Sequence, residues 1–139
     1  MYSPKYNLKR EVPDVATYIR IRLEAGLSRK SEAAATIGLR NSLFSVVAYH
    51  EETPVGIGRV VGDGGCFFEV VDVAVVPNHQ KRGVGDLIMK AVMNYIFETA
   101  PSTAYVSLMA DHHTPRFYER HGFKRSEMPK AAGMFLRIP

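Results

Sequence analysis

The stretch from Glu69 to Thr99 constrains the fold of this chain more than any other part of the sequence. It begins with an apolar, β-branched run of strand length, Val70–Val76, which only Asp72 interrupts. Pro77 ends the run, because proline cannot donate to a sheet ladder. From Gly85 onward the apolar residues recur at helical spacing: Leu87, Ile88, Ala91, Val92, Tyr95 and Ile96. The order is therefore strand, basic glycine loop, helix.

The loop before this helix suits a pyrophosphate group. The first turn of a helix leaves backbone N–H groups unpaired, and the helix dipole places partial positive charge there. Gly83 and Gly85 would let a phosphate approach the backbone, and Lys81 and Arg82 add full charges. An ordinary strand-to-helix connection explains the glycine spacing equally well. The loop is not a nucleoside-triphosphate P-loop or a dinucleotide fingerprint, because their further motif residues are missing.

Three segments together resemble the GNAT superfamily of N-acetyltransferases. Gln80–Gly85 matches its Gln/Arg-x-x-Gly-x-Gly/Ala signature, and Val73–Pro77 resembles its fourth strand. Phe117–Phe123 resembles its tyrosine-containing YExxGF segment. The three occur in the family's order, and the resemblance is specific from Glu69 to Phe123.

The resemblance implies acetyl-CoA as cosubstrate and names the residues that would hold it. They are backbone groups of Val73, Ala74 and Val75 for the acetyl carbonyl and pantetheine, and Gln80, Lys81, Arg82, Gly83, Val84, Gly85 and Asp86 for the pyrophosphate. Seven residues before the motif tyrosine, where the family often has a cofactor-binding asparagine, stands Asp111. An ionised aspartate can accept hydrogen bonds but cannot donate one.

Two side chains are the catalytic candidates that the resemblance implies. Tyr118, the motif tyrosine, is the candidate general acid, since a phenol holds its proton at neutral pH and can donate it to a thiolate. Glu69 is the candidate general base, at the offset from Gln80 where some members carry a catalytic glutamate. The structural alternative for Tyr118 is an aromatic residue of the core, and the alternative for Glu69 is a strand glutamate that faces solvent.

Asp72 is a charged residue within an apolar strand, so it needs a partner, and Arg59 is the candidate. A regular strand would point Asp72 and Glu69 to opposite faces of the sheet, unless a bulge of the kind the family carries intervenes. Asp72 is either structural or orients the substrate. Other members place a glutamate twelve residues before the tyrosine, but here that position is Val106.

The connection between the first two expected helices borders the acceptor site in this family. Arg22, Arg29 and Lys30 are accordingly possible substrate contacts, although each could equally be a solvated cation. An acidic lining from Glu69, Asp72 and Asp111 would favour a cationic acceptor such as a polyamine, an arylalkylamine or an aminoglycoside. His112 and His113 lack a third ligand at metal spacing, so no metal site is expected.

Length and composition indicate one domain covering residues 1–139. The net charge of +4 suits an anionic cofactor, but the basic residues are dispersed, so no nucleic-acid partner is expected. No apolar run approaches a membrane span, and no signal peptide is evident. The single cysteine, Cys66, excludes an internal disulfide and favours the cytosol; a buried or otherwise inert thiol is expected.

The remaining pattern predicts an α+β fold, with a mixed, mostly antiparallel sheet flanked by helices on both faces, as the resemblance also implies. Strands are expected at Tyr6–Arg10, Phe44–His50, Val55–Val61, Cys66–Val76, Ala104–Met109, Phe123–Lys124 and Met134–Ile138, and helices at Pro13–Gly26, Ser31–Arg40, Gly85–Thr99 and Thr114–Arg120.

The first hypothesis for function is an N-acetyltransferase that moves an acetyl group from acetyl-CoA to a primary amine of a small molecule, directly in a ternary complex. A protein lysine or N-terminal acetyltransferase is the second hypothesis, and a non-catalytic acyl-CoA-binding module is the third. A homodimer is possible. The sequence does not identify the acceptor.

Overall fold

The computed structural model describes residues 5–111, 114–126 and 132–139. The chain forms two compact units, Met1–Leu108 and Met109–Pro139.

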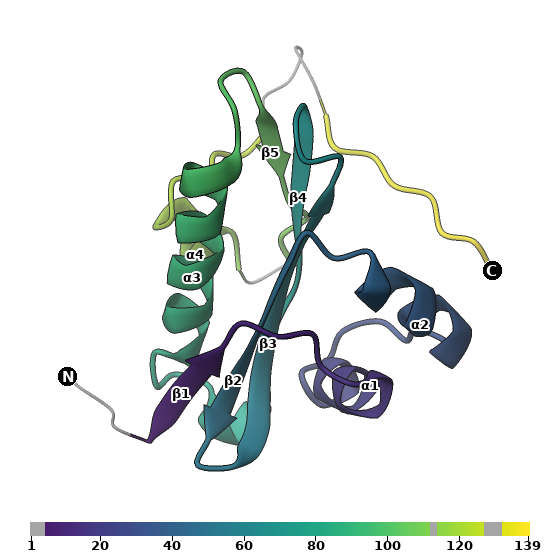
Figure 1. The fold of residues 1–139 in the computed structure, drawn as a ribbon, viewed down its shortest axis with the longest axis vertical. Helices are drawn as coiled ribbons and strands as arrows, with labels where there is room; N and C mark the ends of the chain where they lie inside the picture. Colours follow the sequence, from purple (N-terminus) through teal and green to yellow (C-terminus); the bar gives the residue numbers. More distant parts are fainter. Residues whose placement is uncertain (1–4, 112–113, 127–131) are drawn as a thin grey trace. The chain divides into compact units, whose positions relative to one another are not determined.

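The first unit is built on a five-stranded sheet with the strands in chain order (Figure 1). The strands are β1 (Tyr6–Lys9), β2 (Phe44–His50), β3 (Thr53–Gly62), β4 (Phe67–Val75) and β5 (Tyr105–Ser107). β1 to β4 pair antiparallel, whereas β4 and β5 pair parallel. The predicted mixed, mostly antiparallel sheet is thereby confirmed.

Helices cover both faces of this sheet (Figure 1). They are α1 (Val15–Glu24) and α2 (Glu32–Arg40) on one face and α3 (Val84–Thr99) on the other, with a short 3-10 helix, η1 (Pro77–His79), between β4 and α3. The side chains of Asp14 and Ser31 cap α1 and α2 by accepting from backbone N–H groups. Gly26, at φ 87°, ends α1 in the left-handed conformation expected of a C-terminal glycine.

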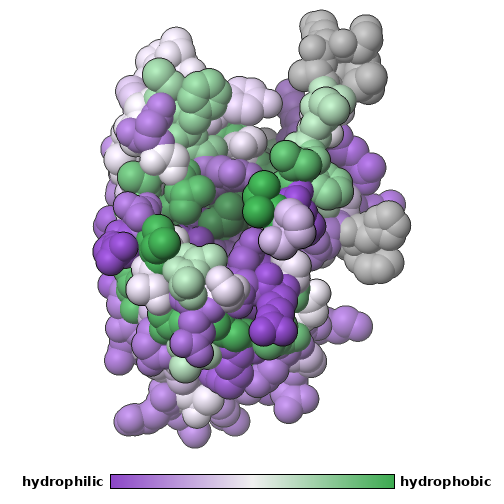
Figure 2. All heavy atoms as spheres, turned by 90° about the vertical axis from the view of Figure 1, so that its right-hand side faces the viewer, coloured by the Kyte–Doolittle hydropathy of each residue, from purple (hydrophilic) through white to green (hydrophobic). Residues whose placement is uncertain are grey.

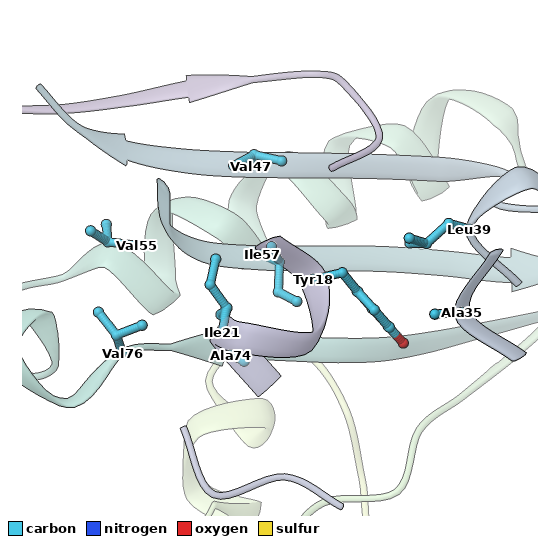
Figure 3. Close-up of a cluster of buried hydrophobic side chains, with 9 residues drawn as sticks. All are labelled: Tyr18, Ile21, Ala35, Leu39, Val47, Val55, Ile57, Ala74 and Val76. Atoms are coloured by element: carbon cyan, nitrogen blue, oxygen red, sulfur yellow. The ribbon is translucent and has the colours of Figure 1, made fainter. Parts of the chain in front are cut away.

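Each face of the sheet buries its own apolar cluster. Figure 3 shows the cluster under α1 and α2, in which Tyr18 and Ile21 of α1 meet Ile57 of β3 and Ala74 of β4. On the other face, α3 lies so close to β3 that a Cβ on Gly58 would stand 2.5 Å from an Ile88 side-chain atom. The α1–α2 side, turned toward the viewer in Figure 2, mixes hydrophobic patches with hydrophilic surface.

The second unit contains one short helix, α4 (Pro115–Glu119), among its described residues. Pro115 stands in its first turn, and Gly122, at φ 97°, follows its end. The Tyr118 ring contacts those of Phe117 and Phe123, with centroids 4.9 and 6.3 Å away.

Three expectations need correction. Phe123–Lys124 and the segment 134–138 form no strand. Apolar alternation makes a strand only where a partner strand offers a ladder, and in the described part of the chain none pairs with the outer edge of β5. Cys66 is exposed, which excludes the buried thiol but not the otherwise inert thiol that the sequence also allows. The connection expected between Lys124 and Met134 includes Met128, which lies outside the described residues. Among the described helices, none combines the length and apolar character needed to cross a membrane.

Candidate functional site

In the described part of the chain, the outer edge of β4 has no partner strand over most of its length, and we call this its open edge. β5 pairs with β4 only from Phe67 to Glu69, although β4 continues to Val75. Within the described residues no strand pairs with this edge beyond Glu69. Backbone N–H and C=O groups need partners, so an open edge can bind an extended ligand that carries amides. Val73, Ala74 and Val75, the predicted backbone contacts, lie in this open segment.

The open edge leads through η1 into the N-terminus of α3. Gly83, at φ 86°, is the N-cap of α3, and none of the described side chains caps this helix. Lys81 also adopts a left-handed conformation, at φ 62°, and the Gln80 side chain closes the loop by donating from Nε2 to the Val75 carbonyl at 2.9 Å. Lys81, Arg82 and Gly83 are exposed. An uncapped helix start with two exposed cations provides the features of an anion site.

A β-bulge interrupts β4 next to this edge. Ile57 pairs with Ala74 and Arg59 with Val71, so Gly58 alone opposes the two residues Asp72 and Val73. Asp72 adopts a left-handed φ of 59° at the bulge. Its carboxylate consequently turns to the face that carries Arg59, α1 and α2. Strict alternation along β4, which would separate Asp72 from Glu69, is therefore wrong at this point, and the expected bulge is confirmed.

Asp72 is the centre of a buried polar network, which we call the Asp72 network: Tyr18, Arg22, Ser28, Gly38, Ser42, Arg59 and Asp72. The carboxylate accepts from the Tyr18 hydroxyl at 2.8 Å, from Arg59 Nε at 2.8 Å, and from Arg22 Nη1. The predicted pairing of Asp72 with Arg59 is confirmed. Burial and the Asp72 carboxylate both raise the pKa of Tyr18, so its hydroxyl stays a donor.

The two arginines extend the Asp72 network to the α1–α2 region. Arg22 Nη2 donates to the Ser28 carbonyl at 2.6 Å and the Ser28 hydroxyl at 3.1 Å. Arg59 Nη1 donates to the Gly38 carbonyl at 3.1 Å and the Ser42 hydroxyl at 2.8 Å. Helical periodicity predicts Tyr18 only as a core residue, and no sequence pattern identifies the two serines.

The predicted acceptor contacts separate into two groups. The side chains of Arg22 and Asp72 are only 7% and 6% exposed and bind each other. Arg29 and Lys30 are exposed on the α1–α2 connection. The first pair thus has internal partners, whereas the second can meet a ligand from solvent.

Glu69 lies on the same face of β4 as the Asp72 network. It pairs with Val61, two residues along β3 from Arg59, and side chains two residues apart on a strand share a face. Glu69 is half-buried, and no hydrogen bond or ion pair joins its carboxylate to the parts of the chain that the structure describes. No described side chain therefore competes with a ligand for this carboxylate.

Tyr118, the candidate acid, belongs to the second unit. Burial and the nearby Asp111 carboxylate raise the pKa of Tyr118 to about 12. The phenol therefore keeps its proton at neutral pH, as a general acid must. Asp111 is itself exposed and accepts from the Thr114 backbone N–H and hydroxyl through its carbonyl, both at 3.0 Å. His112 and His113 lie outside the described residues.

Comparison with known proteins identifies relatives of this chain. The chain shares 38% identity with a probable acetyltransferase of unknown function from meticillin-resistant Staphylococcus aureus, with a TM-score of 0.90 over 96% of this chain and 99% of that one. A GNAT family acetyltransferase from Streptococcus pneumoniae shares the fold, at 23% identity and a TM-score of 0.77 over 96% and 98% of the two chains.

Among curated proteins, the uncharacterized N-acetyltransferase YjcF of Bacillus subtilis is 31% identical over 87 residues, which are 62% of this chain and 59% of that relative. The match thus spans less than two thirds of the relative's length. The model of the acetyltransferase (GNAT) domain matches residues 41–125, more than half of this chain. The chain therefore belongs to the GNAT acetyltransferase family.

Proposed function

We propose that the protein is an acetyl-CoA-dependent N-acetyltransferase that acts on a primary amine of a small molecule, by direct transfer in a ternary complex. The observation that carries this proposal is the continuity between the open edge of β4 and the uncapped start of α3. Pantetheine contains two amides and is followed by a pyrophosphate, so an amide-binding edge that ends in an anion site fits coenzyme A in both chemistry and order.

The proposed roles follow from the hydrogen-bond partners of Glu69 and from the protonation of Tyr118. The amine nitrogen attacks the thioester carbonyl carbon and the carbon–sulfur bond breaks. The amine proton passes to the Glu69 carboxylate, which has no internal partner among the described residues. The departing thiolate takes the Tyr118 proton, which that phenol still holds at neutral pH because its pKa is raised to about 12. Backbone groups of Val73–Val75 orient the thioester.

The charge of the Asp72 network bears on the acceptor. Arg22 and Arg59 both pair with the Asp72 carboxylate, so this residue adds no net negative charge to its face of the sheet. Glu69 then attracts a single ammonium group. This arrangement favours a monoamine such as an arylalkylamine over a polyamine, which a cluster of uncompensated carboxylates would hold better.

Isothermal titration with acetyl-CoA and with free coenzyme A tests the cofactor site. Gly85→Glu places a negative charge in the first turn of α3, where the pyrophosphate should lie, and we expect it to weaken binding at least about tenfold. Gly38→Glu is the matched control, because a Cβ at Gly38 would meet no atom within 4 Å. Unchanged affinity in Gly85→Glu would refute the loop assignment.

Thiol release from acetyl-CoA then tests turnover. The amine panel contains 2-phenylethylamine, spermidine, kanamycin and a lysine-containing peptide. Amine-dependent release with the highest kcat/KM for 2-phenylethylamine is the expected result. Turnover only with the peptide would favour a protein acetyltransferase, and binding without any turnover would favour an acyl-CoA-binding module.

A further inference from the structure

We infer that Arg22 is a positioning residue that couples the α1–α2 connection, residues 25–31, to the bulge of β4. This inference rests on the proposed acetyl transfer. It identifies the side chain that holds the α1–α2 connection in place beside the proposed acceptor site. It gives Arg22 a role different from the direct substrate contact that the sequence suggests.

The contacts of Arg22 join two segments that are far apart in the sequence. Nη1 donates to Asp72 at the bulge, and Nη2 donates to both the carbonyl and the hydroxyl oxygen of Ser28. A planar guanidinium holds such partners in a fixed mutual geometry, which a flexible ammonium cannot do. Arg22 therefore links Ser28 directly to β4, in addition to the packing of Ala25 and Leu27 against the core.

The charges of the Asp72 network indicate that Arg22 contributes position rather than stability. Arg59 alone would neutralise Asp72, because its Nε already lies 2.8 Å from the carboxylate. Arg22 adds a second guanidinium whose side chain is only 7% exposed, and its Nε has no hydrogen-bond partner among the described residues. Burying an extra charge and leaving a donor unpaired both cost stability. What Arg22 contributes in this arrangement is a bridge, formed by its hydrogen bonds to both Asp72 and Ser28.

The bridge lies where the proposed reaction needs a defined geometry. Asp72 immediately precedes Val73, the first of the backbone contacts proposed for the thioester, and shares a sheet face with Glu69. The connection that Arg22 holds carries the exposed cations Arg29 and Lys30. By fixing this connection to the bulge, Arg22 keeps Arg29 and Lys30 at a constant position relative to Glu69, the proposed base.

The test compares Arg22→Gln with Arg20→Gln. Arg22→Gln removes the bridge but leaves the neutral Arg59–Asp72 pair, so the fold should persist. Arg20→Gln makes the same charge change on the same helix, where Arg20 contacts Glu24 and the Pro54 carbonyl outside the Asp72 network. Three quantities are measured: amide hydrogen exchange of residues 25–31 and of α3, the Kd of acetyl-CoA, and the KM and kcat for 2-phenylethylamine or whichever panel amine turns over best.

In Arg22→Gln we expect the rate of amide hydrogen exchange in residues 25–31 to rise at least about tenfold. The KM for the amine should rise by a similar factor, because the loss of one charge-assisted hydrogen bond has an effect of about this size. Exchange in α3 and the Kd of acetyl-CoA should stay within about twofold of the wild-type values, because Tyr18 and Arg59 still hold the bulge. Arg20→Gln should leave all of these quantities unchanged.

Two results would overturn the inference. Unchanged exchange in residues 25–31 would show that Arg22 does not hold the connection. A uniform rise in exchange that includes α3, with KM and Kd changed alike, would show a purely structural role. If the wild-type protein neither binds acetyl-CoA nor releases thiol, the proposed function fails, while the exchange comparison still decides whether Arg22 couples the two segments.

Discussion

Replacing Asp72 with asparagine should destabilise the protein more than any substitution of an exposed charge. The change keeps the size of the side chain but removes the carboxylate that Arg22 and Arg59 share. The two guanidinium groups, 7% and 9% exposed as side chains, would then be buried without a counter-ion. Asparagine also offers only one accepting oxygen, whereas the carboxylate accepts from three donors.

The expected loss follows from this burial. Removing one partner of a buried ion pair costs about 3–5 kcal/mol, whereas an exposed pair contributes about 0–1 kcal/mol. Domains are stable by only about 5–15 kcal/mol, so Asp72→Asn should remove a large part of the total. Since about 1 kcal/mol shifts Tm by roughly 2–8 °C over domain sizes that bracket this chain, Tm should fall by roughly 10 °C or more.

Urea denaturation followed by circular dichroism measures the free energy of unfolding. Glu24→Gln is the control, because Glu24 makes an exposed ion pair with Arg20 at 3.4 Å, and its loss should stay within about 0.5 kcal/mol. The double variant Arg22→Gln/Asp72→Asn restores the net charge of the Asp72 network from +2 to +1 and should recover part of the stability. A loss below about 1 kcal/mol in Asp72→Asn would refute the reasoning, because both arginines would then be solvated.

Three further outcomes are expected. Tyr118→Phe should lower kcat by about 10²-fold with little change in the Kd of acetyl-CoA. In the wild-type protein, the pKa of Tyr118 is raised to about 12, so the rate should not fall through loss of the Tyr118 proton between about pH 7 and 9. Glu69→Gln should lower kcat/KM for the amine by about 10²-fold or more, measured by thiol release, without changing the free energy of unfolding. Gly58→Ala, which would place a methyl group 2.5 Å from an Ile88 atom, should cost about 1–3 kcal/mol in urea denaturation, whereas Gly38→Ala, in open space within α2, should stabilise by about 0.5–1 kcal/mol.

Local patterns predict the elements of the first unit well. Each helix there has its own stop or start residue, such as Asp14, Ser31 and Gly26, and these act within one turn of the chain. β2 runs from Phe44 to His50 as expected, because its apolar run and flanking turns define both ends. Signals of this kind depend only on neighbours in sequence, so they predict the ends of helices and strands whatever the tertiary contacts are.

Patterns that depend on distant partners are less reliable. The apolar alternation at 134–138 predicts a strand, but pairing depends on an edge elsewhere in the chain. The candidate site shows the same limit. The Gln80–Gly85 loop can be found from its residues, whereas the roles of Tyr18, Ser28 and Ser42 depend on contacts across many residues of sequence.

The bulge at Asp72 shows why one residue decides several features of the proposed site. A left-handed conformation disfavours most side chains, but aspartate tolerates it better than β-branched or bulky residues. Glycine would adopt the conformation without strain but would leave Tyr18, Arg22 and Arg59 without their shared acceptor. Aspartate meets both demands, because its carboxylate turns toward α1 at the point where β4 departs from regular pairing. The departure from strand geometry beside Val73–Val75 and the charge network that holds the α1–α2 connection thus have a common physical origin in Asp72.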